Sequence, residues 1–284
     1  MKAQAVDVRT QIQTISRNEN FNKINKGYVN FTKGSTAKKR RETTVWQQMP
    51  VNFFFNLLHH SELYFKQFSA YDERDERQLS FYKESYPETD KYKQKMIQDF
   101  SRTAYISCWY QSENLTDIVF KEYAKGSVGV AIGTKVDTLL NTLTGKEETK
   151  TGIKNELFYG DTVYLSDQTC KDLILPNPAD LISPLFIKSE NHNDDREFRL
   201  AYIMNTAYSD EERFLGITQK DMEMSARLDV EPLELIQTIA VRKDDKCTLE
   251  LTEYLLKDSI KEKTIQIKKD NDMDGFTVIH LERI

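Results

Sequence analysis

The sequence predicts an α+β fold: a single domain with one central mixed sheet flanked by helices, preceded by a basic N-terminal arm. Stretches with the pattern of strands are interspersed with stretches of helical period, in a mixed order and without an internal repeat. The 284 residues are enough for one sizeable core, and 39% hydrophobic with 30% charged residues indicates a charge-rich globule. We therefore divide the chain into an arm, residues 1–42, and a domain, residues 43–284.

Composition also favours a cytoplasmic protein that makes no contact with a membrane. No window approaches the roughly 20 apolar residues that a membrane span needs, and the N-terminus lacks the apolar core of a secretion signal. Cys108, Cys170 and Cys247 are odd in number and far apart, which argues against a disulfide framework and a zinc site. We expect reduced thiols and no resident metal.

Charge is concentrated in the arm. Residues 1–41 hold ten Lys or Arg against Asp7 and Glu19, a balance of +8, so the rest of the chain carries −13. The arm could bind nucleic acid or a partner protein: its cations would neutralise phosphates while Tyr28 and Phe31 stack on bases. The alternative is a solvated tail that lies against the chain's own acidic surface. The residues predicted to contact nucleic acid are Lys38, Lys39, Arg40 and Arg41.

The first predicted elements lie on either side of the end of the arm. Residues 6–15 have the pattern of a short helix. After Pro50, which suits the first turn of a helix, apolar residues recur at helical spacing at Phe54, Leu57 and Leu58. Residues 62–65 then have the pattern of a short strand.

The middle of the chain is expected to alternate between strands and surface helices. A charged turn at residues 70–80 leads into a polar helical stretch that ends near Phe100. Residues 105–109 alternate as a strand, and Asn114 or Thr116 caps a helix that Gly126 ends. The elements predicted next are a buried strand at residues 128–134, in which Gly129 and Gly133 permit a close approach, and a short helix at residues 135–143.

The last part of the chain predicts more strands around one helix. Residues 171–184 contain three prolines, which cannot donate to a sheet ladder, so this segment is a connecting loop. Phe198, Leu200 and Tyr202 continue a strand. The remaining predicted elements are strands at residues 157–166, 235–242 and 264–269 and a helix at residues 251–260.

Five phrases follow one another along the chain: VWQQMPVNFFFNLLHHSELYF, YISCWYQSENLTDIVFKEYAKGSVGVAIGT, VYLSD, PLFIKSENHNDDREFRLAY and LIQTIAVRKDD. In these phrases and their order, residues 43–269 resemble a bacterial family called domain of unknown function 2971. The resemblance implies an accessory protein linked to antiviral defence, such as a toxin, of bacteria or their phages. Two positions depart from it: the family commonly has Arg where this chain has Gln47, and Trp where it has Phe120.

The sharpest enzyme hypothesis is ADP-ribosyl transfer or glycohydrolysis with NAD as substrate. Transferases of this class bring a basic residue or His from an early strand, Ser from a middle strand and Glu from a late strand. Here Ser107 occupies the middle place, and Asp195 and Glu197 the late place. Glu197 would stabilise an oxocarbenium-like state by its charge, Asp195 would assist, and Ser107 would position the substrate.

The same hypothesis assigns cofactor-binding rings, namely Trp46, Trp109 and Tyr123, which would stack on the nucleotide. Gln47 in place of a basic residue leaves open whether NAD binds, with His59 or His60 as a weak substitute.

Two other classes remain open. A metal-dependent nuclease would gather magnesium with Asp72, Glu76, Asp195 and Glu197. A non-catalytic regulatory module would use the arm alone. Some site residues also have a structural interpretation: Ser107 as packing in a buried strand, and Glu197 with Arg199, two apart on one face of a strand, as a cross-strand ion-pair ladder.

Overall fold

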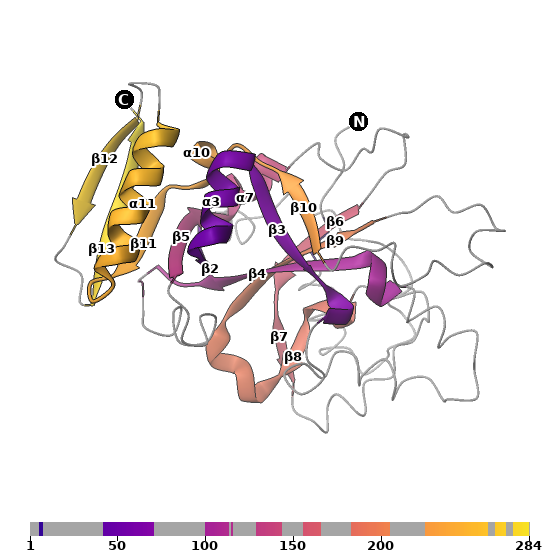
Figure 1. The fold of residues 1–284 in the computed structure, drawn as a ribbon. Helices are drawn as coiled ribbons and strands as arrows, with labels where there is room; N and C mark the ends of the chain where they lie inside the picture. Colours follow the sequence, from indigo (N-terminus) through magenta and orange to yellow (C-terminus); the bar gives the residue numbers. More distant parts are fainter. Residues whose placement is uncertain are drawn as a thin grey trace, which may run out of the picture. The chain divides into compact units, whose positions relative to one another are not determined.

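The structure is a computed structural model that describes residues 6–7, 42–70, 100–113, 115, 129–143, 156–165, 183–204, 225–260, 265–270 and 275–283. These residues confirm the α+β class, with a large, mainly antiparallel sheet and a few helices (Figure 1). The chain divides into two compact units. The first holds Met1–Lys33, Phe65–Cys108 and Gly145–Ala226, and the second holds Gly34–Tyr64, Trp109–Thr144 and Arg227–Ile284.

The sheet strands of the first unit follow the order β1, β6, β9, β4, with β3 beside β4. Their bounds are β1 Val6–Asp7, β6 Glu156–Asp161, β9 Glu197–Ile203, β4 Ala104–Gln111 and β3 Glu62–Gln67. β6 pairs antiparallel with β9, and β1 pairs parallel with β6. All seven residues of β9 are buried, so this strand is covered on both faces. Its apolar Phe198, Leu200 and Tyr202 alternate with Glu197 and Arg199, which share the opposite face.

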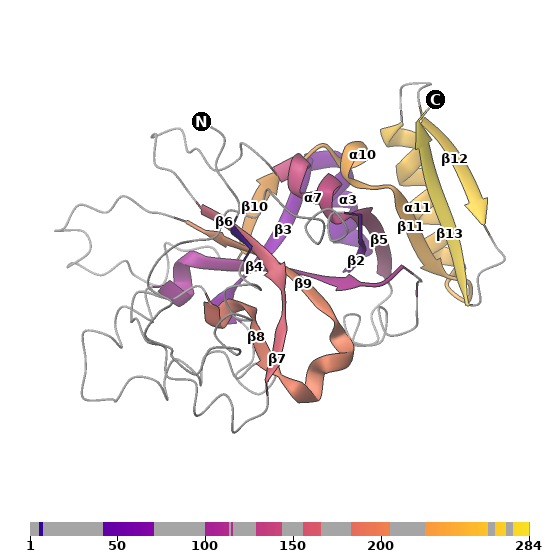
Figure 2. The ribbon, with the colours of Figure 1, turned by 180° about the vertical axis from the view of Figure 1, so that it is seen from behind.

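A smaller parallel pair precedes β9 in the first unit (Figure 2). β7, Val163–Leu165, pairs with β8, Ile187–Ser189. Two 3₁₀ helices flank β8, η3 at Ser183–Phe186 and η4 at Glu190–Asp195. Arg196 then adopts a left-handed conformation, with φ 40° and ψ 47°, and turns the chain from η4 into β9.

The second unit contains the end of β4 followed by β2, β5, β11, β13 and β12. The pairings along this order are antiparallel. The strands are β2 Thr44–Pro50, β5 Gly129–Lys135, β11 Thr238–Arg242, β13 Phe276–Arg283 and β12 Ile265–Asp270, and β10 Ser225–Asp229 pairs with β3. The helices are α3 Val51–His60, α7 Val136–Leu143, α10 Pro232–Leu235 and α11 Lys246–Ser259, the last lying along β11 and β13 in Figure 1.

A close approach between β2 and β5 anchors the core of the second unit. Trp46 faces Gly133 in the register, and a Cβ at Gly133 would lie 2.7 Å from the Trp46 ring. The ring is buried, and its Nε1 donates to the carbonyl oxygen of Ser112 at 3.0 Å. A side chain at position 133 would therefore displace the indole, which is why glycine is needed there.

Most elements expected from the sequence are present where the structure describes them. The helix after Pro50 is α3, with Phe54, Leu57 and Leu58 buried, and the expected strands and helix near the C-terminus are β11, α11 and β12. Three expected segments lie wholly or mostly outside the described residues: the turn at residues 70–80, the helix from Asn114 or Thr116 and the proline-containing loop.

Two expectations were wrong in detail. Val6 and Asp7 form a strand rather than the start of a helix, because their backbone pairs with Phe158 and Tyr159 of β6. The single strand expected at residues 157–166 is two strands, β6 and β7, separated at Thr162, whose N–H donates to the carbonyl oxygen of Glu197 at 2.8 Å. Among the described residues no helix is long and apolar enough to cross a membrane.

Candidate functional site

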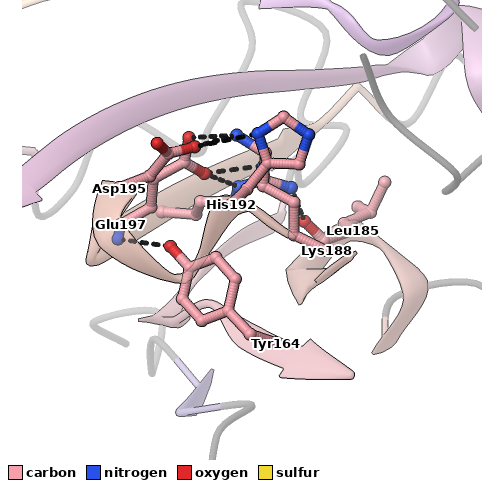
Figure 3. Close-up of polar contacts among 7 residues, drawn as sticks. Tyr164, Leu185, Lys188, His192, Asp195 and Glu197 are labelled. Atoms are coloured by element: carbon pink, nitrogen blue, oxygen red, sulfur yellow. Dashed lines mark hydrogen bonds and ion pairs between the residues drawn. The ribbon is translucent and has the colours of Figure 1, made fainter. Parts of the chain in front are cut away.

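Four charged side chains of the first unit gather where β8, η4 and β9 meet (Figure 3). We call this group the charge cluster; it consists of Lys188, Asp195, Glu197 and Arg199. Two of the groups are cations and two are anions, so their formal charges cancel. All four residues are buried, and the side chains of Arg199 and Glu197 are 0% and 2% exposed. The interior of the first unit therefore holds a balanced set of charges.

Lys188 and Arg199 hold the two oxygens of the Glu197 carboxylate. Lys188 Nζ lies 3.0 Å from Oε1, and Arg199 Nε and Nη2 lie 2.7 and 2.6 Å from Oε2. Lys188 Nζ also donates to Asp195 Oδ2 at 2.5 Å, and Arg199 Nη1 donates to the carbonyl oxygen of Leu185 at 2.8 Å. Lys188 thus bridges the two carboxylates, while Arg199 ties Glu197 to the segment before β8.

The local backbone explains why these side chains meet. In the extended β9, residues 197 and 199 lie on one face because side chains alternate along a strand. The left-handed Arg196 turns the end of η4 so that Asp195 lies beside Lys188. Tyr164 of β7 fixes the first residue of β9, because its hydroxyl oxygen accepts the Glu197 N–H at 2.8 Å.

The cluster keeps Glu197 and Lys188 ionised at neutral pH. Burial raises the pKa of Glu197, but the charges of Arg199 and Lys188 and their hydrogen bonds outweigh burial and lower it to about 2. Burial lowers the pKa of Lys188, yet the neighbouring Glu197 and Asp195 raise it above its ordinary value overall. Burial and the charge of Glu197 raise the pKa of Tyr164, so its hydroxyl stays protonated.

The cluster has a more accessible outer side at η4. The His192 side chain is 35% exposed, and its Nδ1 lies 3.6 Å from Asp195 Oδ2. Figure 3 shows the His192 ring beside the carboxylates, with Tyr164 approaching Glu197 from another direction. A molecule in solvent would meet His192 and the side of Asp195 and Lys188 before it met Glu197.

The structure brings two of the three predicted catalytic residues together. Asp195 and Glu197 share Lys188 as a counter-ion. Ser107 lies on β4, the strand next to β9, and is buried with 2% of its surface exposed. The catalytic roles of the three residues stay predictions. Arg199 pairs with Glu197 of its own strand, β9, and the expected cross-strand ladder stays a prediction.

The other predicted site residues lie elsewhere or outside the described chain. Trp46 and Trp109 belong to the second unit, where both are buried, so their roles as stacking rings stay predictions. Gln47, where the family has Arg, is half-buried on β2 of the same unit. The residues outside the described part are Tyr123, Lys38, Lys39, Arg40 and Arg41.

The carboxylates suggested for magnesium are only partly described. Asp72 and Glu76 lie outside the described residues, and Asp195 and Glu197 face Lys188 and Arg199. Within the part of the chain that the structure describes, no group of three or more His, Cys, Asp or Glu side chains could hold a metal ion.

Sequence reasoning missed Lys188 and Tyr164. Lys188 follows Leu185, Phe186 and Ile187, and a cation directly after an apolar run is a signal that a buried carboxylate lies nearby, since a lone buried ammonium is costly. Tyr164 carries no comparable signal, because tyrosine is common in strands.

No family model, no curated protein and no solved structure matches this chain. The resemblance to domain of unknown function 2971 therefore stays a prediction from the residues quoted above.

Proposed function

We propose that this protein is a non-catalytic nucleic-acid-binding module whose basic arm contacts phosphates. The observation that carries the proposal is the charge cluster: Asp195 and Glu197 are neutralised by Lys188 and Arg199 inside the first unit. Such a cluster fixes the start of β9, which is a structural role. The arm, with its net charge of +8, then supplies the concentrated charge that can bind a partner.

The charge distribution also indicates how the arm would bind. Residues 42–284 carry −13 and repel a polyanion, which confines contact to the arm. Four consecutive cations at residues 38–41 can each neutralise one phosphate. Neutralising Z phosphates of a single strand gives a slope of log K against log salt of about −0.7Z, so these four residues contribute about −3 to the slope.

The test is fluorescence anisotropy with a labelled single-stranded oligonucleotide across a salt series. The informative variant replaces Lys38, Lys39, Arg40 and Arg41 with Gln in the full chain. Deleting the whole arm would also remove β1, which pairs with β6. A loss of binding could then result from a disturbed fold instead of from the missing cations. We expect the variant to bind more weakly and to lose about 3 from the magnitude of the salt slope.

A matched control changes four exposed cations of the body to Gln, namely Lys243, Lys246, Lys268 and Arg283. The control should keep the affinity and the slope of the original protein. Absence of binding at low salt, or equal loss in both variants, would contradict the proposal. If the arm instead lies against the acidic body, the original protein and both variants will show no measurable oligonucleotide binding. The variant at residues 38–41 will then change the salt dependence of unfolding, and the proposal is contradicted.

A second candidate, an effector that cleaves NAD, is favoured by one observation. Glu197 is held ionised, with a pKa of about 2, two residues after Asp195. A carboxylate that stabilises an oxocarbenium-like ribosyl group must be an anion. In this reaction the bond between ribose and nicotinamide breaks, nicotinamide leaves with the electron pair, and water or an acceptor nucleophile bonds to the ribose. Lys188 would have to leave Oε1 for the ribose to approach.

Release of nicotinamide from NAD by the purified protein, alone and with cell extract, tests this candidate. Glu197→Gln should abolish release and any toxicity in cells. Arg199→Lys is the matched control, because it disturbs the same cluster and keeps both carboxylates. Equal activity in Glu197→Gln and the original protein, or no release under any condition, would exclude Glu197 as a catalytic residue.

A further inference from the structure

The outer face of α11 in the second unit is an exposed stripe. Cys247, Leu251, Tyr254 and Asp258 follow one another at spacings of four, three and four residues, which places them on one side of the helix. Leu251 is 42% exposed and Tyr254 is 69% exposed. A different side of α11 is buried through Thr248, Thr252, Leu255 and Leu256. The helix therefore packs on its own unit by one face and presents the exposed stripe, which we call the seam, to solvent.

The exposed seam continues onto α3 within the same unit. His59 Nε2 lies 3.8 Å from Asp258 Oδ2, and the Phe55 ring stacks on the His59 ring with 4.4 Å between centroids. Phe55 is itself an exposed large hydrophobic residue. Exposed apolar side chains on neighbouring helices, at the spacing of a coiled-coil seam, are typical of a helix-to-helix contact.

Two charges beside the seam indicate which partner fits. Glu250 and Lys257 are exposed, lie one heptad apart and therefore share one flank of the stripe. Neither forms an ion pair with another residue in the described parts of the second unit. When two copies of such a helix pack antiparallel, the same flank of each helix meets the other. Each Glu250 then lies opposite Lys257 of the other copy, while a parallel pair would not match these charges.

We propose that α11 forms an antiparallel, two-fold symmetric contact with α11 of a second copy of this chain. Leu251 and Tyr254 lie at its centre, Phe55 at its edge, and two Glu250–Lys257 pairs fix the orientation. The self-complementary pattern matches a two-fold interface, in which the same patch is used by both copies. The seam is only two heptads long, so the dimer is a weak one. This inference is independent of the proposed function.

Charge reversal tests the contact in the full-length protein. Sedimentation velocity over a concentration series, up to the solubility limit, should show a reversible monomer–dimer equilibrium. Glu250→Lys and Lys257→Glu each place like charges opposite each other twice, and each should weaken dimerisation about tenfold. The double reversal restores opposite charges in the antiparallel arrangement and should return the dissociation constant close to its original value.

Two controls separate the contact from folding and from net charge. Lys243→Glu changes the charge by the same amount as Lys257→Glu just before α11, away from the seam, and should leave dimerisation unchanged. Circular dichroism should report equal helix content in all variants, because both reversed residues are exposed. A protein that stays monomeric at all concentrations, or a double reversal that does not recover, would overturn the proposal.

Discussion

At the scale of single residues, Glu197 shows how burial and charge together fix a role. A carboxylate that is 2% exposed cannot stay ionised unless cations compensate for its lost hydration. Arg199 and Lys188 provide that compensation, one at each oxygen. A buried ion pair adds little net stability compared with apolar residues packed in its place. Removing one partner, however, leaves the other charge buried without a counter-ion. The cluster is therefore sensitive to the loss of any single member.

We predict that Glu197→Gln lowers the free energy of unfolding by about 3 kcal/mol, because Arg199 and Lys188 then lack their shared counter-ion. Urea denaturation followed by circular dichroism measures the change. Glu234→Gln is the matched control, since Glu234 forms an exposed pair with Arg283 at 3.7 Å among the described residues, and it should cost less than about 1 kcal/mol. Equal effects of the two substitutions would show that the cluster is not a buried network.

The sequence contains part of this site in readable form. Alternation along a predicted strand places Glu197 and Arg199 on one face, where we expected a cross-strand ladder and the structure pairs the two residues with each other. The apolar run before Lys188 indicates a buried cation, but its carboxylate partners could not be anticipated, because they depend on the left-handed turn at Arg196 and on the β7–β8 pairing, which are tertiary features. A sequence can place charges on a face, but it does not show whether a distant cation neutralises them.

At the scale of elements, the close contact between β2 and β5 depends on a glycine. The Trp46 ring occupies the space where a side chain at position 133 would lie, and its Nε1 is bonded to Ser112. The pairing is antiparallel over seven residues, so a local displacement disturbs a long ladder. The close approach was expected from Gly133 itself, but the aromatic partner was not.

We predict that Gly133→Ala lowers the free energy of unfolding by about 2 kcal/mol, because the added methyl group overpacks against the indole. The double variant Gly133→Ala, Trp46→Phe should be less destabilised than the sum of its single variants, since the smaller ring leaves room for the methyl group. Thermal and urea denaturation measure both effects. Strict additivity would indicate that the two residues do not touch.

Elements with a strong local pattern were predictable, and elements defined by partners were not. The apolar spacing at Phe54, Leu57 and Leu58 determines α3 without reference to the rest of the chain. By contrast, β1 is only two residues long and exists because β6 accepts it as a neighbour. β13 was missed altogether, although it lies between β11 and β12 and completes their sheet.

At the scale of the whole molecule, the separation of charge along the chain has consequences for stability and binding. The arm carries a net charge of +8 and the remainder −13. The total of −5 is therefore the sum of two parts of the chain with opposite charge. Falling pH neutralises ordinary carboxylates of the body first, and Glu197, whose pKa is about 2, at lower pH. The arm gains nothing from this change, because Lys and Arg are already protonated.

We predict that acid removes the stabilising contribution of Glu197 between about pH 5 and pH 2. The folded pKa, about 2, lies below the unfolded value, so the contribution is complete above the unfolded pKa and is lost as pH falls through the folded pKa. A shift of this size corresponds to about 3 kcal/mol. Urea denaturation at a series of pH values should show this loss in the original protein, and a much flatter dependence in Glu197→Gln would confirm its source.

The account depends most on the state of the Glu197 carboxyl group. A titration of carboxyl ¹³C resonances by NMR, with the Glu197 signal identified by its absence in Glu197→Gln, measures that state directly. A buried, cation-bound carboxylate should titrate with a midpoint of about 2 and keep its chemical shift when NAD or an oligonucleotide is added. A midpoint near the ordinary glutamate value of about 4.3, or a change in chemical shift on addition of NAD, would contradict the conclusion that the charge cluster has a structural and not a catalytic role.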